Sequence, residues 1–208
     1  EPEFGGVLAK MDLATADGMS VAWLMRMLGR AGQQRVNGPD LMIRCCERAA
    51  REGQSIFLFG NTDKTLDMLA LRLRERLPGL RIAGRLAPPF RAFSAEEDLR
   101  VVADINASGA NIVFVSLGCP KQERWIVEHT KQIRAVMIGV GAAFEFHSGA
   151  RARAPTWMQR SGLEWLYRMI CEPGRLTGRY FSTNLSFIVG AAAQLRRERI
   201  AENSLLRR

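Results

Sequence analysis

The residues best suited to chemistry lie in one short stretch, Gly118-Cys119-Pro120-Lys121-Gln122-Glu123, directly after an apolar run over residues 112–117. The run is rich in β-branched side chains, which is typical of a strand buried on both faces of a parallel sheet. Gly118 permits a sharp turn, and Pro120 fits the first position of a helix that continues with Lys121. Free N–H groups at a helix N-terminus, placed at the carboxyl end of a strand, suit a phosphate or diphosphate. The alternative is an ordinary buried strand and turn.

Two further segments contain residue types that are found in active sites. Asp17 lies beside Gly18 in a turn-like stretch, and these residues alone favour a turn or N-cap role over a catalytic one. Residues 139–144 read GVGAAF and begin like a dinucleotide-binding loop, but Phe144 occupies the place of the third glycine. An NAD site is therefore weakly supported, and a turn whose backbone approaches another ligand is the alternative.

The segments around these residues alternate between strand-like and helix-like patterns. From Ser55 to Ile138, short apolar runs are separated by segments with apolar residues at helical spacing. Ser94 and Glu97 form a capping-box pattern at the start of one of these helices. Strands are expected over residues 55–59, 80–83, 112–117 and 135–138, and helices over 21–28, 39–52, 66–77 and 94–107. The pattern predicts an α/β fold with a Rossmann-like parallel sheet flanked by helices.

Positive charge is concentrated at the C-terminal end. The 208 residues carry a net charge of +9, of which +7 comes from residues 151–208, a segment with eleven arginines and no lysine. A helix is expected over 156–171, broken by Glu172-Pro173-Gly174, and a mostly apolar stretch follows over 181–195. That stretch is shorter than the roughly twenty residues that span a bilayer. We therefore expect a Rossmann-like domain over 1–150 and a basic helical appendage over 151–208. The appendage either lies on an anionic membrane or packs on the domain as a helical pair.

The sequence offers few ligands for a metal ion. The four cysteines show no CxxC spacing and there are only two histidines, so we expect a reduced, cytoplasmic protein without a metal site. The acidic run Glu96-Glu97-Asp98 is explained by its place in the first turn of a helix. A bound diphosphate would then be held by arginine, lysine and helix N-termini, and no cofactor is expected. Because the sequence begins with Glu1, we expect its N-terminal part to be incomplete.

Several stretches together resemble the WecG/TagA/CpsF glycosyltransferases, glycosyltransferase family 26. The most distinctive is Leu117-Gly118-Cys119-Pro120-Lys121-Gln122-Glu123 with Trp125-Ile126. The others follow the family in order: Ala16-Asp17-Gly18-Met19, Arg35-Val36-Asn37-Gly38-Pro39-Asp40-Leu41, Gly139-Val140-Gly141-Ala142-Ala143-Phe144, Arg153-Ala154-Pro155, and Gly162-Leu163-Glu164-Trp165-Leu166-Tyr167-Arg168 with Glu172-Pro173. Cys119 and Glu145 depart from the family pattern, and the family's first strand and its Asn- and Thr-containing loop are not found before Asp17.

The resemblance implies an inverting, metal-independent transfer of a sugar from a UDP-sugar to a polyprenyl-diphosphate-linked glycan. The product would feed a bacterial surface polysaccharide such as wall teichoic acid, enterobacterial common antigen, capsule or exopolysaccharide. By this resemblance Asp17 is the general base, Arg35 binds a substrate phosphate and Gln122 lines the sugar-nucleotide pocket. A carboxylate can take the proton of the acceptor hydroxyl, and cationic donors can stabilise the departing UDP. The matched stretches also supply the other residues expected to bind substrate: Asn37, Asp40, Gly118, Lys121, Glu123, Gly139 and Gly141.

The resemblance also favours a membrane role for the appendage, so the protein is expected at the inner face of the cell membrane, attached peripherally from the cytoplasm. Arg168, Arg175 and Arg179 are spaced i, i+7 and i+11, and would share one helical face if the break at Pro173 were mild. We expect them to contact lipid headgroups or the diphosphate of the acceptor. The sequence leaves the oligomeric state open, including a homo-oligomer.

Two other functions fit parts of the sequence. A Rossmann-type, nucleotide-dependent oxidoreductase would use residues 139–144, and a nucleic-acid-binding module would use the arginine-rich tail. The tail matches no known reader motif, so nucleic acid is not expected as a partner.

Overall fold

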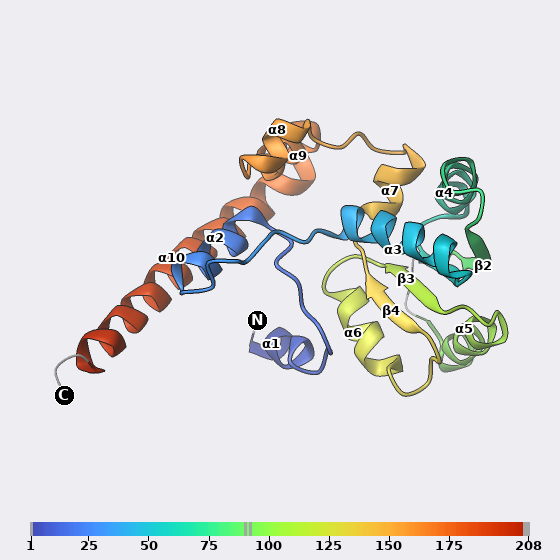
Figure 1. Cartoon of the computed structure of the whole chain (residues 1–208), viewed down its shortest axis with the longest axis horizontal. Helices are drawn as coiled ribbons and strands as arrows, with labels where there is room; N and C mark the ends of the chain where they lie inside the picture. The colour runs from blue at the N-terminus through green and yellow to red at the C-terminus, as the bar shows by residue number, and fades with distance from the viewer. Residues whose placement is uncertain (1, 90, 92, 206–208) are drawn as a thin grey trace. The chain divides into compact units, whose positions relative to one another are not determined.

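The computed structural model describes residues 2–89, 91 and 93–205 of the chain (Figure 1). The chain forms two compact units. The first contains Glu1–Ala14 and Asn37–Ala152, and the second contains Thr15–Val36 and Arg153–Arg208. The predicted division into domains over 1–150 and 151–208 stays a prediction.

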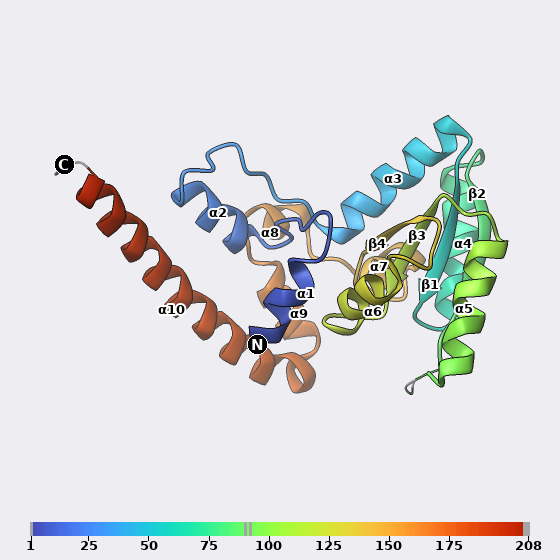
Figure 2. The same cartoon turned by 90° about the horizontal axis from the view of Figure 1, so that it is seen from below.

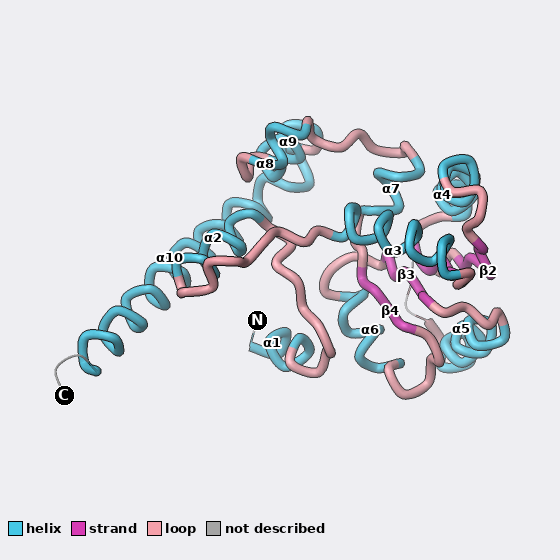
Figure 3. The backbone as a smooth tube through the Cα atoms, viewed as in Figure 1, coloured by secondary structure: helices cyan, strands magenta, loops and turns pink. Residues whose placement is uncertain are grey.

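The first unit is built on a four-stranded parallel sheet with the strand order β2-β1-β3-β4; strands are magenta in Figure 3. Its strands are β1 (Ser55–Gly60), β2 (Arg81–Leu86), β3 (Ile112–Ser116) and β4 (Val136–Gly139). The predicted α/β fold with a parallel sheet is confirmed. The second strand is longer than predicted and continues to Leu86, because its register with β1 runs as far as Phe59.

Helices cover both faces of the sheet, because alternate residues of the central strands point to opposite sides. Ile56, Leu58 and Phe114 pack in one core cluster with the helices α3, α4 and α7. Phe57, Phe59, Val113 and Val115 pack in a second cluster with α5 and α6. Figure 1 shows these two helical layers on either side of the strands, and Figure 2 looks onto the layer that contains α5 and α6. The helices are α3 (Gly38–Glu52), α4 (Asp63–Arg76), α5 (Ala95–Ala107), α6 (Lys121–His129) and α7 (Ala143–Ser148).

A short helix, α1 (Pro2–Leu8), was not predicted from the sequence pattern. It packs beside α6 in the first unit, where Glu3 lies 3.9 Å from Arg124. Two glycines in so short a helix give it little intrinsic helix propensity, and this explains why the pattern did not reveal it.

Polar side chains cap the start of α5 and join α5 to α6. The predicted capping box is present, since Ser94 Oγ accepts from the Glu97 N–H and the Glu97 carboxylate accepts from the Ser94 N–H. Asp98 does more than complement the helix dipole, as its carboxylate contacts His129 Nε2 (2.8 Å) and accepts a hydrogen bond from Trp125 Nε1 (3.2 Å). The ring of His129 is buried and stacks on Trp125. His129 is therefore a structural residue.

The second unit consists of α2 (Met19–Met27), α8 (Thr156–Arg160), α9 (Glu164–Cys171) and α10 (Pro173–Leu205). The prediction of one helix over 156–171 was wrong, because the chain turns at Gly162, whose φ is +73°. A Cβ atom at Gly162 would lie 2.9 Å from the Trp23 ring, so a glycine is also required there by packing.

The break predicted around Pro173 is confined to Glu172, whose φ of −138° and ψ of 62° are not helical. Arg168 therefore lies on α9, whereas Arg175 and Arg179 lie on α10. The three arginines do not share one continuous helix, and the side chains of Arg175 and Arg179 lie outside the described residues, so the common face expected for a mild break stays a prediction. Among the residues that the structure describes, no helix combines the length and the apolar character needed to cross a membrane.

We predict that Asp98→Ala lowers the free energy of unfolding by about 1–3 kcal/mol, because it leaves buried donors on His129 and Trp125 unpaired. The exposed Asp104 lies on the same helix, and Asp104→Ala should change stability by no more than about 0.5 kcal/mol. Urea denaturation of the parent and both variants measures the difference. Equal loss of stability in the two variants would show that the contacts of Asp98 with α6 contribute nothing.

Candidate active site

The carboxyl ends of β1 and β3 lie where the strand order reverses, because the chain passes from β1 to β2 on one side and then to β3 on the other. Open α/β sheets bind ligands at such a point. The strand ends approach closely: a Cβ atom at Gly60, whose φ is +127°, would lie 2.4 Å from the Ser116 carbonyl oxygen. The Ser116 hydroxyl donates to the Gly141 carbonyl oxygen (2.7 Å) and so ties the end of β3 to the loop that follows β4.

Gln122 connects three other residues of the predicted site. Its side chain is buried in the first turn of α6. Its Oε1 atom accepts a hydrogen bond from the Gly141 N–H (3.2 Å), and its Nε2 atom donates to Glu123 Oε1 (2.6 Å). A Cβ atom at Gly139 would lie 3.0 Å from Gln122 Nε2, so the glycine leaves room for the amide. The structure thus brings Gln122, Glu123, Gly139 and Gly141 together, and Gln122 fixes the loop that follows β4.

Gly118 and Lys121 lie at the turn from β3 into α6. Gly118 has a φ of +79°, and its carbonyl oxygen accepts from the Gln122 N–H (2.9 Å). Pro120 precedes α6 rather than opening it, but the predicted place of Lys121 in the first turn is confirmed. Lys121 is exposed, and its Nζ atom lies 5.9 Å from the centre of the Phe93 ring. Its ammonium group is therefore at the surface of the carboxyl edge.

The beginning of α3 also lies at this edge. Asn37 is buried and caps α3, accepting from the Asp40 N–H (3.0 Å) and donating to the Asp40 carboxylate (2.7 Å). A Cβ atom at Gly38 would lie 2.4 Å from the Val140 carbonyl oxygen, so a glycine lets the helix start against the loop after β4. These contacts give Asn37 and Asp40 a structural role, and their binding of substrate stays a prediction.

Asp17 and Arg35 lie in the second unit. Arg35 Nε donates to the Asp17 carbonyl oxygen (2.5 Å), Nη1 donates to the Gln159 carbonyl oxygen (3.3 Å), and Nη2 contacts Glu164 Oε2 (2.5 Å). A backbone hydrogen bond from Val36 to Ala16 runs alongside (3.0 Å). The structure therefore brings the two predicted residues together, with the guanidinium of Arg35 oriented by the protein.

The carboxyl group of Asp17 is accessible at the surface, yet protein atoms surround it on most sides. This desolvation raises the pKa of Asp17 above its ordinary value of 3.8, and the nearby Glu164 carboxylate raises it further. The positive charges of Arg35, Arg168 and Arg153 act in the opposite direction. Asp17 does not cap α2, since Gly18 is the N-cap residue. A carboxylate with a raised pKa among cationic side chains is typical of an active site.

Two of the charged neighbours of Asp17 were not predicted from the sequence as site residues. Glu164 and Arg153 both occur in the stretches that resemble the glycosyltransferase family, and that was the only available signal. The Nε atom of Arg168 is buried and makes no hydrogen bond within the described part of the chain. The side chains of Arg175 and Arg179 lie outside the described residues, so their predicted contacts stay predictions.

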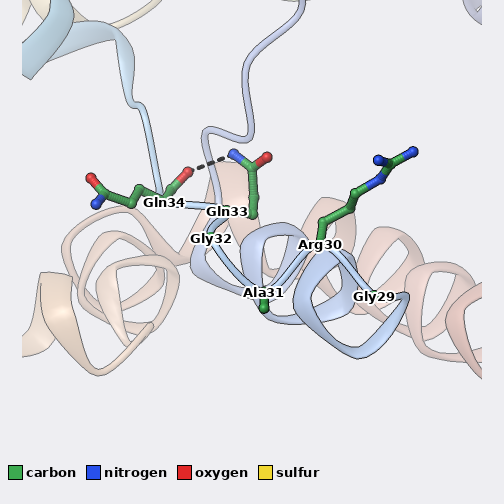
Figure 4. Close-up of a pocket in the computed structure, with 6 residues that line it drawn as sticks. All are labelled: Gly29, Arg30, Ala31, Gly32, Gln33 and Gln34. Carbon is green, nitrogen blue, oxygen red and sulfur yellow. Dashed lines mark hydrogen bonds between the residues drawn. The ribbon is translucent and has the colours of Figure 1, made fainter.

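The loop after α2 forms a surface hollow lined by residues 29–34 (Figure 4). Gln33 Nε2 donates to the Gln34 carbonyl oxygen across it (2.8 Å). None of the predicted site residues lines this hollow. In the described ranges, His, Cys, Asp and Glu do not form a group of three or more that could hold a metal ion.

Comparison with known proteins agrees with the motifs. The sequence model of the glycosyl transferase WecG/TagA/CpsF family matches residues 1–201. A relative from Bacillus spizizenii, N-acetylglucosaminyldiphosphoundecaprenol N-acetyl-beta-D-mannosaminyltransferase, is 32% identical over 176 residues, which are 84% of this chain. The chain spans 66% of the length of that relative, slightly less than two thirds. The predicted resemblance is confirmed, and the chain belongs to the WecG/TagA/CpsF family of glycosyltransferases.

Proposed function

We propose that this protein transfers a sugar from a UDP-sugar to a polyprenyl-diphosphate-linked glycan, with inversion and without a metal ion. The name of the Bacillus relative gives its acceptor as N-acetylglucosaminyldiphosphoundecaprenol, and we propose an acceptor of the same class for this chain. Membership of the family supports glycosyl transfer over the oxidoreductase and nucleic-acid alternatives. The product would enter bacterial surface polysaccharide synthesis.

The observation that carries the proposal is the placing of the Asp17 carboxyl among three arginines and Glu164. In an inverting transfer, a base removes the proton of the acceptor hydroxyl while its oxygen attacks the anomeric carbon and the bond to UDP breaks. A carboxylate whose pKa is raised accepts that proton more readily than a free aspartate does. Cationic side chains can offset the charge that develops on UDP without a metal ion.

The carboxyl edge of the sheet is proposed to bind the sugar nucleotide. Lys121 presents an exposed ammonium group in the first turn of α6, and the amide of Gln122 holds the loop that contains Gly139 and Gly141. A helix N-terminus favours anionic ligands, and a diphosphate is one. Gly118, Glu123, Asn37 and Asp40 are the other residues proposed to bind substrate at this edge.

The C-terminal helix is proposed to hold the protein at an anionic membrane surface. Leu185, Ile188 and Val189 are exposed on α10 at i, i+3 and i+4, so their side chains lie on one side of that helix. Arg196 and Arg197 are exposed further along it. Apolar side chains next to arginines suit the boundary between headgroups and acyl chains. The proposed location is therefore the inner face of the cell membrane.

The proposed activity is tested by incubating the protein with a panel of UDP-sugars and a short-chain polyprenyl-diphosphate-linked N-acetylglucosamine. We expect release of UDP with at least one donor, dependent on the acceptor, and the same rate in the presence of EDTA. Absence of transfer with every donor would contradict the proposed function. A loss of activity in EDTA that Mg²⁺ or Mn²⁺ restores would contradict metal independence alone.

The variant Asp17→Asn distinguishes a catalytic role of Asp17 from a purely structural role in the turn. We expect the rate of transfer to fall by about 10²–10⁴ while the affinity for UDP stays within a few-fold.

Because desolvation raises the pKa of Asp17, its ionised form destabilises the folded state at neutral pH. The variant should therefore be more stable than the parent at pH 7, and this gain should disappear as the pH falls toward 3.8.

Thermal denaturation across this pH range measures the effect on stability, with the exposed Asp12→Asn as the control. A turn aspartate would give the opposite result, namely a less stable variant that keeps its activity.

The membrane role is tested with Ile188→Gln combined with Val189→Gln, two exposed positions in α10. We expect binding to anionic vesicles to weaken roughly tenfold or more, because burying one such side chain stabilises by about 1.5–3 kcal/mol. The matched control combines Leu71→Gln with Leu99→Gln, which are exposed apolar positions in the first unit. Vesicle flotation compares the variants with the parent. Equal binding by the parent and both variants would contradict a contact through α10.

A further inference from the structure

The guanidinium group of Arg35 makes more hydrogen bonds with the protein itself than binding a phosphate would require. Each of its three guanidinium nitrogens has a protein acceptor: the carbonyl oxygens of Asp17 and Gln159, and the carboxylate of Glu164. The side chains of Arg35 and Glu164 are only 15% and 16% exposed, so solvent screens their pairing weakly. Most of the hydrogen-bonding capacity of this guanidinium is therefore used within the second unit.

Glu164 is the partner that fixes this arrangement. It lies in the first turn of α9, and its Oε2 atom is 2.5 Å from Arg35 Nη2. Through Arg35 it is connected to the backbone of Asp17, 2.5 Å from Arg35 Nε. Its negative charge also acts directly on the Asp17 carboxyl, against the positive charges of Arg35, Arg168 and Arg153.

We propose that Glu164 is a positioning residue for sugar transfer, which through Arg35 holds Asp17 in place and offsets the arginine charge that Asp17 experiences. This inference rests on the proposed function, in which Asp17 is the general base. Glu164 has no contact with substrate in this account. Arg35 then acts as a brace between two chain segments, whereas the family resemblance assigns it to a substrate phosphate.

The charge balance predicts the direction of the effect. Desolvation and Glu164 raise the pKa of Asp17, and the three arginines lower it. When the charge of Glu164 is removed, the arginines act without that opposition, so the pKa of Asp17 falls. A carboxylate with a lower pKa is a weaker base, and proton transfer from the acceptor slows. The variant Glu164→Gln removes this charge while keeping the length of the side chain and an oxygen that can accept a hydrogen bond from Arg35.

The test uses the full chain and follows the Asp17 carboxyl carbon by NMR during a pH titration, with Asp17→Asn identifying the signal. In Glu164→Gln we expect the midpoint to move to lower pH and kcat to fall about three- to tenfold, while KM for the donor changes less than twofold. Glu164→Ala, which also removes the brace, should lose more activity than Glu164→Gln. The control is Glu128→Gln, an exposed position on α6, which should leave both readouts unchanged.

An unchanged Asp17 midpoint in Glu164→Gln would overturn the inference. A shifted midpoint in a protein that transfers no sugar would instead overturn the proposed function and leave the brace in place, so the two failures are distinguishable. Arg35→Lys provides a second test, because it keeps the charge but cannot bridge three acceptors. The brace predicts a reduced kcat with unchanged UDP affinity. Weaker UDP binding at an unchanged kcat would show that Arg35 is a phosphate ligand and would overturn the inference.

Discussion

The guanidinium of Arg35 joins the two chain segments that make up the second unit. Glu164 is 129 residues away from it in sequence, yet the two side chains form a largely buried pair at 2.5 Å. The same guanidinium donates to the carbonyl oxygens of Asp17 and Gln159. Removing one member of a buried pair leaves an uncompensated charge, so each residue depends strongly on the other. This pair holds the backbone of Asp17 through Arg35 and supplies two of the charges that act on its carboxyl group.

At the carboxyl edge of the sheet in the first unit, close backbone approach brings the chain segments together. Gly60 and Gly38 let the end of β1 and the start of α3 come against the carbonyl oxygens of Ser116 and Val140, where a Cβ atom would collide. Gln122 then holds the loop after β4 through a hydrogen bond with Gly141. The result is an edge with a helix start, a glycine-containing loop and one exposed lysine, which are features suited to an anionic ligand.

Local patterns in the sequence predicted most of the first unit. Alternating apolar runs indicated the parallel sheet, and the spacing of Ser94 and Glu97 indicated a capping box, because both depend on neighbouring residues. Contacts between distant segments could not be predicted in this way. The pairing of Arg35 with Glu164 and the packing of Gly162 against Trp23 depend on tertiary structure, and no periodicity encodes them. The family resemblance pointed to Asp17 and Arg35, but it did not reveal that Arg35 is oriented by Glu164.

We propose that Asp17, with its raised pKa, removes the proton of the acceptor. The pH dependence of kcat/KM for sugar transfer by the unmodified protein tests it most directly, because its acidic limb reports the essential base of the free enzyme. If Asp17 is the base, protonation of one group should abolish activity, with a midpoint above 3.8, the ordinary pKa of aspartate. Activity that persists without loss down to pH 3.8 would contradict it.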